Sequence, residues 1–284
     1  MAERKFPPWL KVRYSQSGSF NNTVSIINDN NLHTVCQSAL CPNRGECFAE
    51  GTATFLILGN VCTRSCLFCA ISKGRVEAID CEEPERVAKA ISEMKLDFAV
   101  ITSVTRDDLP DGGAFIFVET IRMIRKYSPG TGIEVLTPDF KGDEDALKAV
   151  ASANPDVFNH NIETVPRLYP VVRPEADYGR SLKVLKKMRE LMPQAGIKSG
   201  LMAGIGEERD EVYKVLEDLR SAGCNLLTIG QYLSPSQKHL PVKEFVTPEQ
   251  FKEYGAYATS LGFEAVASAP LVRSSYHAKK MVQK

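Results

Sequence analysis

The chain has 284 residues, of which 43% are hydrophobic and 25% are charged, as in a globular protein with a sizeable core. Its 35 basic and 35 acidic side chains cancel, so the composition predicts neither nucleic acid nor a membrane as a partner. No apolar run approaches the length of a transmembrane helix. The eight cysteines and the absence of a secretion-type apolar segment in residues 1–8 predict a reducing compartment, the cytoplasm.

From residue 52 onward, short apolar runs typical of strands alternate with amphipathic stretches typical of helices. Thr247-Pro248-Glu249 predicts the start of the last helix, with a capping threonine, a first-turn proline and a first-turn acid. Gly223 and Gly262 predict left-handed helix ends. The expected strands cover residues 54–58, 98–102, 133–137, 157–162, 197–203, 226–229 and 263–267, and the expected helices cover residues 85–94, 114–127, 144–151, 178–192, 210–222 and 248–261.

This alternation of apolar strands and helices predicts an α/β fold with a parallel sheet covered by helices. About six βα units indicate a partial TIM-like barrel rather than a complete eight-fold one. We expect one domain over residues 1–284. It would consist of an N-terminal extension (1–51), a partial (β/α)6 barrel (52–267) and a C-terminal tail (268–284).

In parallel α/β barrels, functional groups collect in the loops that follow the carboxyl ends of the strands. Residues 62–69 follow the first expected strand, and residues 105–113 follow the second. Glu163 closes the fourth strand, and the glycine-bearing turn 204–207 follows the fifth. The sequence therefore predicts that these four segments meet at one edge of the barrel.

Six of the eight cysteines form two triplets, spaced C-x4-C-x5-C and C-x3-C-x2-C. Three thiolates are one ligand short of a closed tetrahedral zinc site and of a fully ligated cubane iron–sulfur cluster. Two such sets predict two metal centres, each with one position left for a group other than cysteine. The triplets are Cys36, Cys41 and Cys47, followed by Cys62, Cys66 and Cys69.

Structural zinc is the competing interpretation, with His33 completing the first triplet. Zinc ligands usually come in pairs two to four residues apart, and such pairs recur. Only Cys66/Cys69 and, more loosely, Cys62/Cys66 fit that spacing, so clusters are favoured over zinc. A ferredoxin-like electron carrier would have fully cysteine-ligated clusters and would not need a barrel. Cys224 is expected to be a buried small hydrophobe, and Cys81 is assigned no role.

The second triplet, with Phe68 directly before its last cysteine, resembles the signature of radical S-adenosylmethionine (SAM) enzymes. In that superfamily three cysteines bind a [4Fe-4S] cluster, and SAM occupies the fourth iron. The first triplet resembles the auxiliary-cluster motif of the lipoyl synthase family. The segment 270–278 does too, and there the family's serine ligand corresponds to Ser275. Further matching segments are 102–113, 158–164, 171–174 and 230–236.

This resemblance implies a sulfurtransferase that inserts two sulfur atoms at C6 and C8 of a protein-bound octanoyl-lysine. A radical derived from SAM would remove the hydrogens, two SAM molecules would be used, and an auxiliary [4Fe-4S] cluster would give up sulfide. The implied auxiliary-cluster ligands, which we also count as catalytic, are Cys36, Cys41, Cys47 and Ser275. The expected cofactor contacts are Phe68, Gly112, Gly113, Asn161, Glu163 and Arg173.

The implied partners are an octanoylated lipoyl carrier domain or glycine-cleavage H protein, a flavodoxin- or ferredoxin-type reductant, and an iron–sulfur carrier for cluster repair. Another two-cluster radical SAM enzyme, biotin-synthase-like or methylthio-transferring, is the alternative, and the first triplet's spacing and the serine tail argue against it.

Several residue roles stay open at this stage. Phe68 either flanks the adenine or belongs to the core, and Asn161 and Glu163 either contact the cofactor or bond to each other. Ser274 is a second candidate for the serine ligand. Arg106, Arg173 and Arg273 are either charge contacts or surface residues, and the basic set Arg180, Lys183, Lys186, Lys187 and Arg189 is either a solvated helix face or a surface that steers an acidic carrier.

Overall fold

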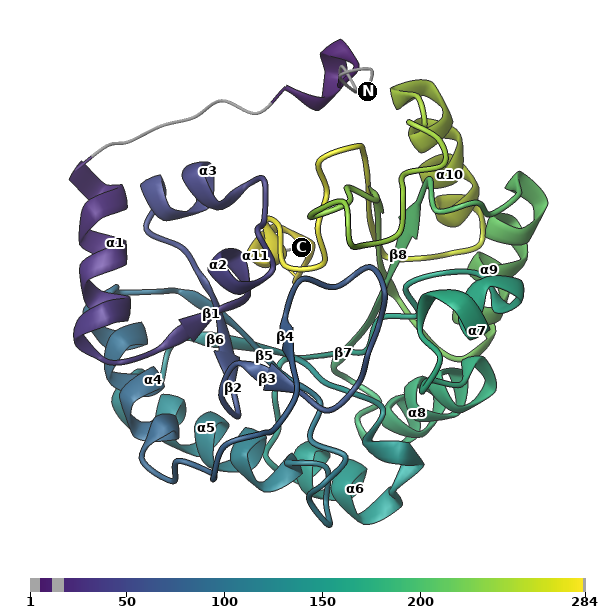
Figure 1. Ribbon diagram of the computed structural model, residues 1–284. Helices are drawn as coiled ribbons and strands as arrows, with labels where there is room; N and C mark the ends of the chain where they lie inside the picture. Colours follow the sequence, from purple (N-terminus) through teal and green to yellow (C-terminus); the bar gives the residue numbers. More distant parts are fainter. Residues whose placement is uncertain (1–5, 12–17, 283–284) are drawn as a thin grey trace.

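The computed structural model describes residues 6–11 and 18–282 of the chain. Residues 1–5, part of the segment expected to lack a targeting sequence, lie outside the described residues. The main sheet has eight strands in the order β1-β2-β5-β6-β7-β8-β9-β10 (Figure 1). Its strands are β1 (His33–Thr34), β2 (Thr54–Ile57), β5 (Phe98–Ser103), β6 (Gly132–Leu136), β7 (Val157–Asn159), β8 (Gly196–Ala203), β9 (Leu226–Gln231) and β10 (Ala265–Ser268).

All neighbouring strands from β2 to β10 pair in parallel, and only β1 pairs antiparallel, with β2. The order ends at β1 and β10, so the described strands form an open barrel. Helices surround this barrel on its outside, as Figure 1 shows. They are α4 (Glu83–Glu93), α5 (Ala114–Tyr127), α6 (Glu144–Ser152), α8 (Tyr178–Leu191), α9 (Arg209–Ser221) and α10 (Pro248–Ser260).

The α/β partial TIM-like barrel predicted from the sequence is therefore confirmed, with each expected strand and helix found within a few residues of its predicted bounds. Continuous apolar runs become strands buried on both faces, as in β2 and β9. Thr247 caps α10 by accepting a hydrogen bond from the Gln250 N–H at 3.2 Å, and Gly223 after α9 has φ +90°. The division into extension, barrel and tail at residues 51 and 267 stays a prediction.

The sequence did not predict α1 (Gly18–Asp29), nor the short elements at the two ends and around the barrel mouth, which have too few residues to show a period. Near the N-terminus the short elements are the 3-10 helix η1 (Pro8–Leu10), α2 (Val35–Ser38) and α3 (Arg44–Ala49). Elsewhere they are β3 (Val61–Cys62), β4 (Ser72–Lys73), η2 (Phe140–Gly142), η3 (Pro166–Leu168), α7 (Tyr169–Val172) and α11 (Ala278–Val282).

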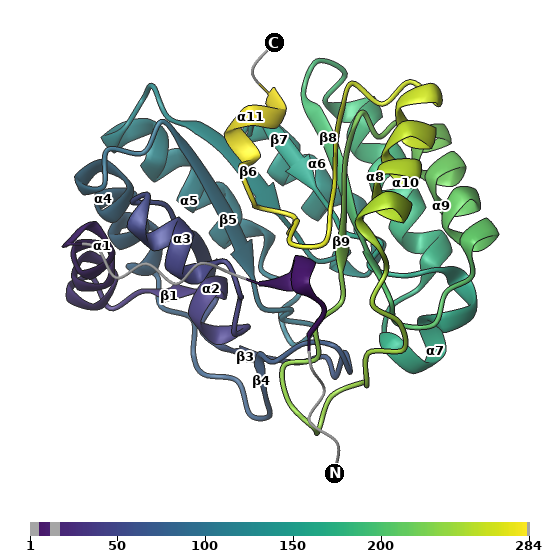
Figure 2. The same ribbon diagram turned by 90° about the horizontal axis from the view of Figure 1, so that it is seen from above.

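The two ends of the chain meet beside the open edge of the barrel. Asn43 Nδ2 donates to the Leu271 carbonyl at 2.8 Å, and the Tyr276 hydroxyl donates to Glu46 Oε1 at 2.9 Å. Figure 2 shows the C-terminal segment running past β9 toward α11. These contacts bring residues from opposite ends of the sequence to one place.

A buried ion pair joins three adjacent strands inside the barrel. Lys198 Nζ lies 2.9 and 3.0 Å from the two carboxylate oxygens of Glu134, and Asn159 Nδ2 donates to the same carboxylate at 2.7 Å. Both charged side chains are essentially inaccessible to solvent. A charge in such a position is tolerated only while its partner is present.

We expect the replacement Glu134→Leu to lower the free energy of unfolding by about 3–5 kcal/mol, because it leaves the Lys198 ammonium buried without a counter-charge. The double replacement Glu134→Leu/Lys198→Met should cost less than the single one, since no charge remains. Urea denaturation followed by circular dichroism measures both. A double variant less stable than the single one would contradict this account of the pair.

Candidate active site

A cavity of about 480 Å³ opens at the carboxyl end of the sheet. Its wall combines strand ends with the loop after β2, the N-terminal segment around α2, and the C-terminal tail. Seven of the predicted ligand or tail residues line it: Cys36, Cys41, Cys62, Cys66, Cys69, Ser274 and Ser275. The structure therefore brings five of the six triplet cysteines and the predicted serine to one space.

The second triplet lies in the loop directly after β2, at the place where parallel barrels position functional groups. The backbone N–H groups of Arg64 and Thr105 both donate to Cys62 Sγ, each at 3.4 Å. Burial raises the pKa of Cys69 to about 12 and also raises that of Cys66, which the Arg173 charge opposes. Buried thiols of this kind become thiolates at neutral pH only when they are bound to a metal.

Arg64, between the first two cysteines of this triplet, locks the loop to its neighbours. Its side chain is only 4% exposed and makes two hydrogen bonds to Asp107, at 2.7 and 3.0 Å, and one to Asp139 at 2.6 Å. Arg180 Nε donates to the second oxygen of Asp139 at 2.7 Å. Burial alone would raise the pKa of Asp139, but the Arg64 charge holds it well below its usual range. Asp139 and Arg64 are therefore both ionised, and their ion pair, with Asp107, holds three loops together.

Backbone hydrogen bonds complete the attachment of this loop. The Thr63 N–H donates to the Thr105 carbonyl at 3.0 Å, on the side of β5. At the opposite side, the Leu67 N–H donates to the Val172 carbonyl at 3.0 Å, and the Leu67 carbonyl accepts from the Leu240 N–H at 3.2 Å. The cysteines are thus held on a loop that three other segments support.

The first triplet surrounds the other end of the cavity. Cys36 and Cys41 line it, while Cys47 lies just behind them on α3. Burial raises the pKa of Cys47 to about 12, and the charges of Cys36 and Cys41 add to this, so the three thiols are electrostatic neighbours. Burial also raises the pKa of Cys36 to about 11. Three neighbouring thiols, one buried and two partly buried, suit a cluster rather than free cysteines.

The tail reaches this triplet by crossing the end of β9. A Cβ atom at Gly230 would lie 2.0 Å from the Val272 carbonyl oxygen, so only glycine permits the crossing. The Gln231 N–H donates to the Pro270 carbonyl at 3.2 Å. Ser275 then faces the cavity that Cys36 and Cys41 line. Arg273 is partly buried in this crossing, and desolvation lowers its pKa while the Cys41 charge opposes the change.

Polar residues that close β7 form the floor of the cavity. Asn161 Nδ2 donates to Glu163 Oε1 at 3.1 Å. This hydrogen bond is one of the two alternatives expected from the sequence, the other being contact with the cofactor. Glu163 has φ +65°, unusual for a residue with a side chain, and its backbone is held by the Gly200 carbonyl and the Met202 N–H. Burial raises its pKa, and the Arg173 charge and the Asn161 amide oppose this.

Four buried polar atoms in the lining have no hydrogen-bond partner among the described residues. They are Ser103 Oγ, Thr137 Oγ1, Asn161 Oδ1 and Arg173 Nε. Buried polar groups are almost always satisfied, so such a set indicates a polar ligand in the cavity. Phe68 lines the same space. The lining therefore fits a ligand with both polar and aromatic parts.

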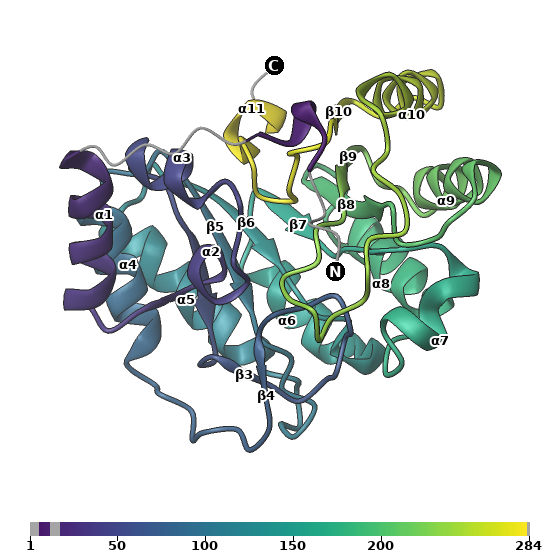
Figure 3. The same cartoon turned by 45° about the horizontal axis from the view of Figure 1, so that its top comes forward.

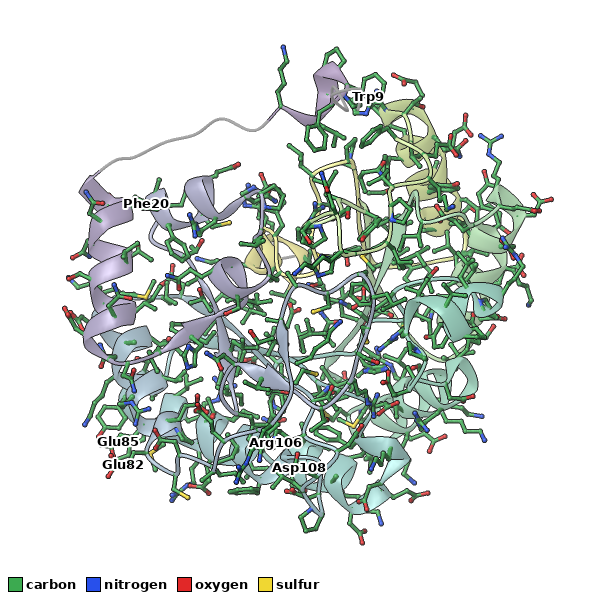
Figure 4. The ribbon with its side chains drawn as sticks, viewed as in Figure 1. Trp9, Phe20, Glu82, Glu85, Arg106 and Asp108 are labelled. Carbon is green, nitrogen blue, oxygen red and sulfur yellow. The ribbon has the colours of Figure 1, made fainter. Side chains whose placement is uncertain are left out.

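Some predicted residues do not line the cavity. Gly112 and Gly113 directly precede α5, where a Cβ atom would lie 3.0 Å from Phe140 and 2.4 Å from Leu58, so close packing also explains these glycines. Their role as cofactor contacts stays a prediction. Arg106 pairs with Asp108 at 2.8 Å and is drawn with it away from the barrel centre in Figure 4.

The turn 204–206 is also outside the lining, because the Glu207 carboxylate accepts its three backbone N–H groups. His33, the fourth ligand in the zinc interpretation, lies on β1 and is absent from the lining. Within residues 6–11 and 18–282, no group of three or more His, Cys, Asp and Glu side chains is arranged to hold a single metal ion. Cys224 is fully buried in the core, as predicted.

Sequence reasoning missed the residues that support the site. Arg64 stands inside the cysteine motif, and its position between two ligands was the available signal. Asp107 and Asp139 each follow a strand, but a single acid in a loop predicts nothing by itself. Gly200 has no local signal, although a Cβ atom there would lie 2.7 Å from Asn161 Oδ1.

Comparisons with known proteins agree with this geometry. The sequence profile of the Radical SAM superfamily matches residues 56–219. Among solved structures, methylornithine synthase aligns over 96% of this chain and 85% of its own, with a TM-score of 0.53 at 12% identity. HydG, a maturase of the [FeFe]-hydrogenase, aligns over 93% and 74%, with a TM-score of 0.58 at 13% identity. The chain is a member of the radical SAM superfamily, whose fold it shares.

Closer relatives define the family. Lipoyl synthase from Rubrobacter xylanophilus is 55% identical over 277 residues, covering 98% of this chain and 86% of that protein. Lipoyl synthase from Caldanaerobacter subterraneus subsp. tengcongensis is 57% identical over 278 residues, covering 98% and 97%. The chain belongs to the lipoyl synthase family. It is a radical SAM enzyme that inserts sulfur, with a [4Fe-4S] cluster and SAM as cofactors. Among the described helices, none has the length and apolar content to cross a membrane.

We expect Arg64→Gln to reduce the iron and acid-labile sulfide bound per chain, because the loop of the second triplet loses its attachment to Asp107 and Asp139. Arg64→Lys should be intermediate, since one ammonium group cannot bond to both carboxylates. Arg106→Gln is the matched control, because Arg106 is equally buried and pairs with an aspartate of the same loop outside the cavity. Equal cluster loss in the two glutamine variants would contradict a specific role for Arg64.

Proposed function

We propose that the two triplets carry two different [4Fe-4S] clusters with separate tasks. Cys62, Cys66 and Cys69 would hold the cluster that SAM completes. Cys36, Cys41, Cys47 and Ser275 would hold an auxiliary cluster. When bound, these groups supply the hydrogen-abstracting radical and the two sulfur atoms that enter an octanoyl-lysine at C6 and C8. The observation that carries the proposal is that five of the six triplet cysteines and Ser275 line one cavity of about 480 Å³.

The chain's own residues would bind SAM through the unsatisfied polar groups of the floor. Arg173 is buried, and its Nη1 already donates to the Asn161 carbonyl at 3.0 Å, which leaves Nε for a ligand acceptor. Glu163 offers a carboxylate for the amino group, and Phe68 offers an apolar face. Because the Arg173 charge lies near Cys66, this residue would also balance the negative charge of the bound cluster.

Ser275 would act as the replaceable ligand of the auxiliary cluster. An alkoxide is a harder ligand than a thiolate and suits iron–sulfur chemistry less well. A cluster that must give up its sulfur needs an iron that can leave, so the weakest ligand belongs at the cavity. Ser274 lines the same space but precedes the residue that matches the family motif.

The substrate would be a protein, the octanoylated lipoyl domain or H protein, whose acyl-lysine enters the cavity from its mouth. A flavodoxin- or ferredoxin-type protein would supply electrons, and an iron–sulfur carrier would rebuild the auxiliary cluster. All eight cysteines of the chain are free, and six must be available as thiolates, so we place the enzyme in the reducing cytoplasm.

The two triplets should separate genetically. Cys62→Ala, Cys66→Ala or Cys69→Ala should abolish formation of 5′-deoxyadenosine from SAM, because the cluster that SAM completes cannot form. Cys36→Ala, Cys41→Ala or Cys47→Ala should retain this cleavage but yield no lipoyl product. Anaerobic turnover with an octanoyl-lysyl peptide, followed by mass spectrometry of both products, measures this. A first-triplet variant that still makes lipoyl-lysine would refute its assignment as the sulfur source.

Ser275 distinguishes a ligand from a solvated tail residue. As a ligand, Ser275→Ala should lower cluster occupancy and leave little or no lipoyl product. Ser275→Cys should hold the full iron content, because a thiolate binds iron well, yet insert sulfur poorly because that iron leaves less readily. Ser274→Ala is the matched control and should leave both properties near wild type. Full iron content and normal product in Ser275→Ala would transfer the role to another residue.

A further inference from the structure

Two loops at the mouth of the cavity carry an excess of positive charge. The first, residues 62–76, contains the second cysteine triplet and β4; the second, residues 232–243, follows β9. We call them the mouth loops. Figure 3 shows them running side by side below the strand ends. The Leu240 N–H bonds to the Leu67 carbonyl at 3.2 Å, and His239 Nε2 lies 3.2 Å from the Cys69 carbonyl oxygen.

The exposed charges of the mouth loops all have one sign. Both segments lack Asp and Glu, and their exposed cations are Lys73, Arg75, Lys238 and Lys243. None of these four forms an ion pair with a residue that the structure describes. Lys73 Nζ instead donates to the Cys66 carbonyl at 2.9 Å. Since the whole chain carries no net charge, this is a local concentration of uncompensated cations.

Nearby acids do not pair with these exposed cations. Arg64, the fifth cation of the two loops together, is buried and already balanced by Asp107 and Asp139. Glu175 approaches the first loop, but it is held by the Ser65 N–H and hydroxyl. Glu77 and Glu244 directly follow the two loops in the sequence, and in the part of the chain that the structure describes neither forms an ion pair with these cations.

Apolar side chains are exposed beside these cations. Leu67 is 39% exposed, between two backbone hydrogen bonds that fix its position, and Val171 on the adjoining α7 is 55% exposed. Leu40, in the loop of the first triplet, is 61% exposed and has φ +52°, a conformation unfavourable for leucine. Large apolar groups held in place at the edge of a cavity, next to unpaired charges, are typical of a protein-docking surface.

We infer that the mouth loops, with Leu67 and Val171, are the docking surface for the protein substrate, and that the substrate's surface around the octanoylated lysine is acidic. This inference rests on the proposed function, because only a protein-bound acyl chain brings a second protein against the mouth. Opposite charges steer such a complex and fix its orientation, while the apolar contacts hold it. The acyl-lysine then enters the cavity between the two triplets.

The test reverses charge at two exposed cations that are not used in the site, Lys238→Glu/Lys243→Glu. Its matched control is Lys183→Glu/Lys186→Glu, two exposed lysines on α8 that also form no ion pair with a described residue. This control also tests the basic face of α8, which the sequence offered as another surface for an acidic carrier. The cluster-loaded enzymes are compared with an octanoylated carrier domain and with a short, uncharged octanoyl-lysyl peptide.

We expect the mouth variant to bind the octanoylated carrier at least about tenfold more weakly, because rim charges control association. This defect should shrink at high ionic strength, where exposed charges are screened. Formation of 5′-deoxyadenosine and lipoyl product from the peptide should stay at the wild-type level. The α8 control should match the wild type with both substrates.

Unchanged carrier binding in the mouth variant, or an equal loss in the α8 control, would overturn the docking assignment. So would competition by double-stranded DNA as strong as that by the carrier, since the surface would then be a general polyanion binder. The proposed function fails separately. A wild-type enzyme that binds the carrier in a salt-dependent way but converts neither substrate would refute the sulfur insertion and leave the docking surface standing.

Discussion

Parallel pairing of the strands is the constraint on which the rest of the molecule depends. When every strand from β2 to β10 runs in one direction, all carboxyl ends lie at one edge, and each following loop is delivered there. The sheet also stays open between β1 and β10, so segments outside the barrel can approach the same edge. Cys36 and Ser275 come from opposite ends of the chain and reach one cavity because of these two properties. Gly230 completes the arrangement by letting the tail cross β9.

Both triplets lie in similar electrostatic surroundings. Burial is the main reason that the thiol pKa values are raised in both. Carboxylates add to this effect in each place, Glu46 and Glu50 at Cys47, and Glu163 and Glu175 at Cys66. An arginine opposes it in each place, since Arg173 favours the thiolate of Cys66 and Arg273 lies near Cys41. Each triplet therefore combines buried thiols with a nearby cation, which suits a bound, negatively charged group better than free thiols.

The sequence predicted the barrel well because its signals are repeated and local. Seven apolar runs alternate with six amphipathic ones, and Thr247 and Gly223 mark helix ends through chemistry within a few residues. The cysteine triplets are equally local. The supporting contacts were not predictable in this way, because Arg64 meets Asp107 and Asp139 across more than forty positions in the sequence. Gly112 and Gly113 show a different limit of prediction from sequence, because a local pattern can have two explanations. Their glycine pattern fits both a ligand-binding turn and the close packing found against Leu58 and Phe140.

The net charge of zero does not show how charges are distributed over the fold. Because the chain has equal numbers of basic and acidic residues, it has no overall electrostatic field that would attract a partner at long range. Within the fold, however, buried charges are paired with opposite charges, whereas the exposed charges of the mouth loops are not. Lys198 and Arg64 are buried and matched to carboxylates, because an unpaired buried charge would be destabilising. The exposed cations of the mouth loops have no such requirement, because water solvates them. The acids nearest to them form no ion pairs with them among the described residues. A neutral chain can therefore present a positive surface at the opening of its cavity. Because salt screens exposed charges beyond the Debye length, this surface acts on a partner only at close approach.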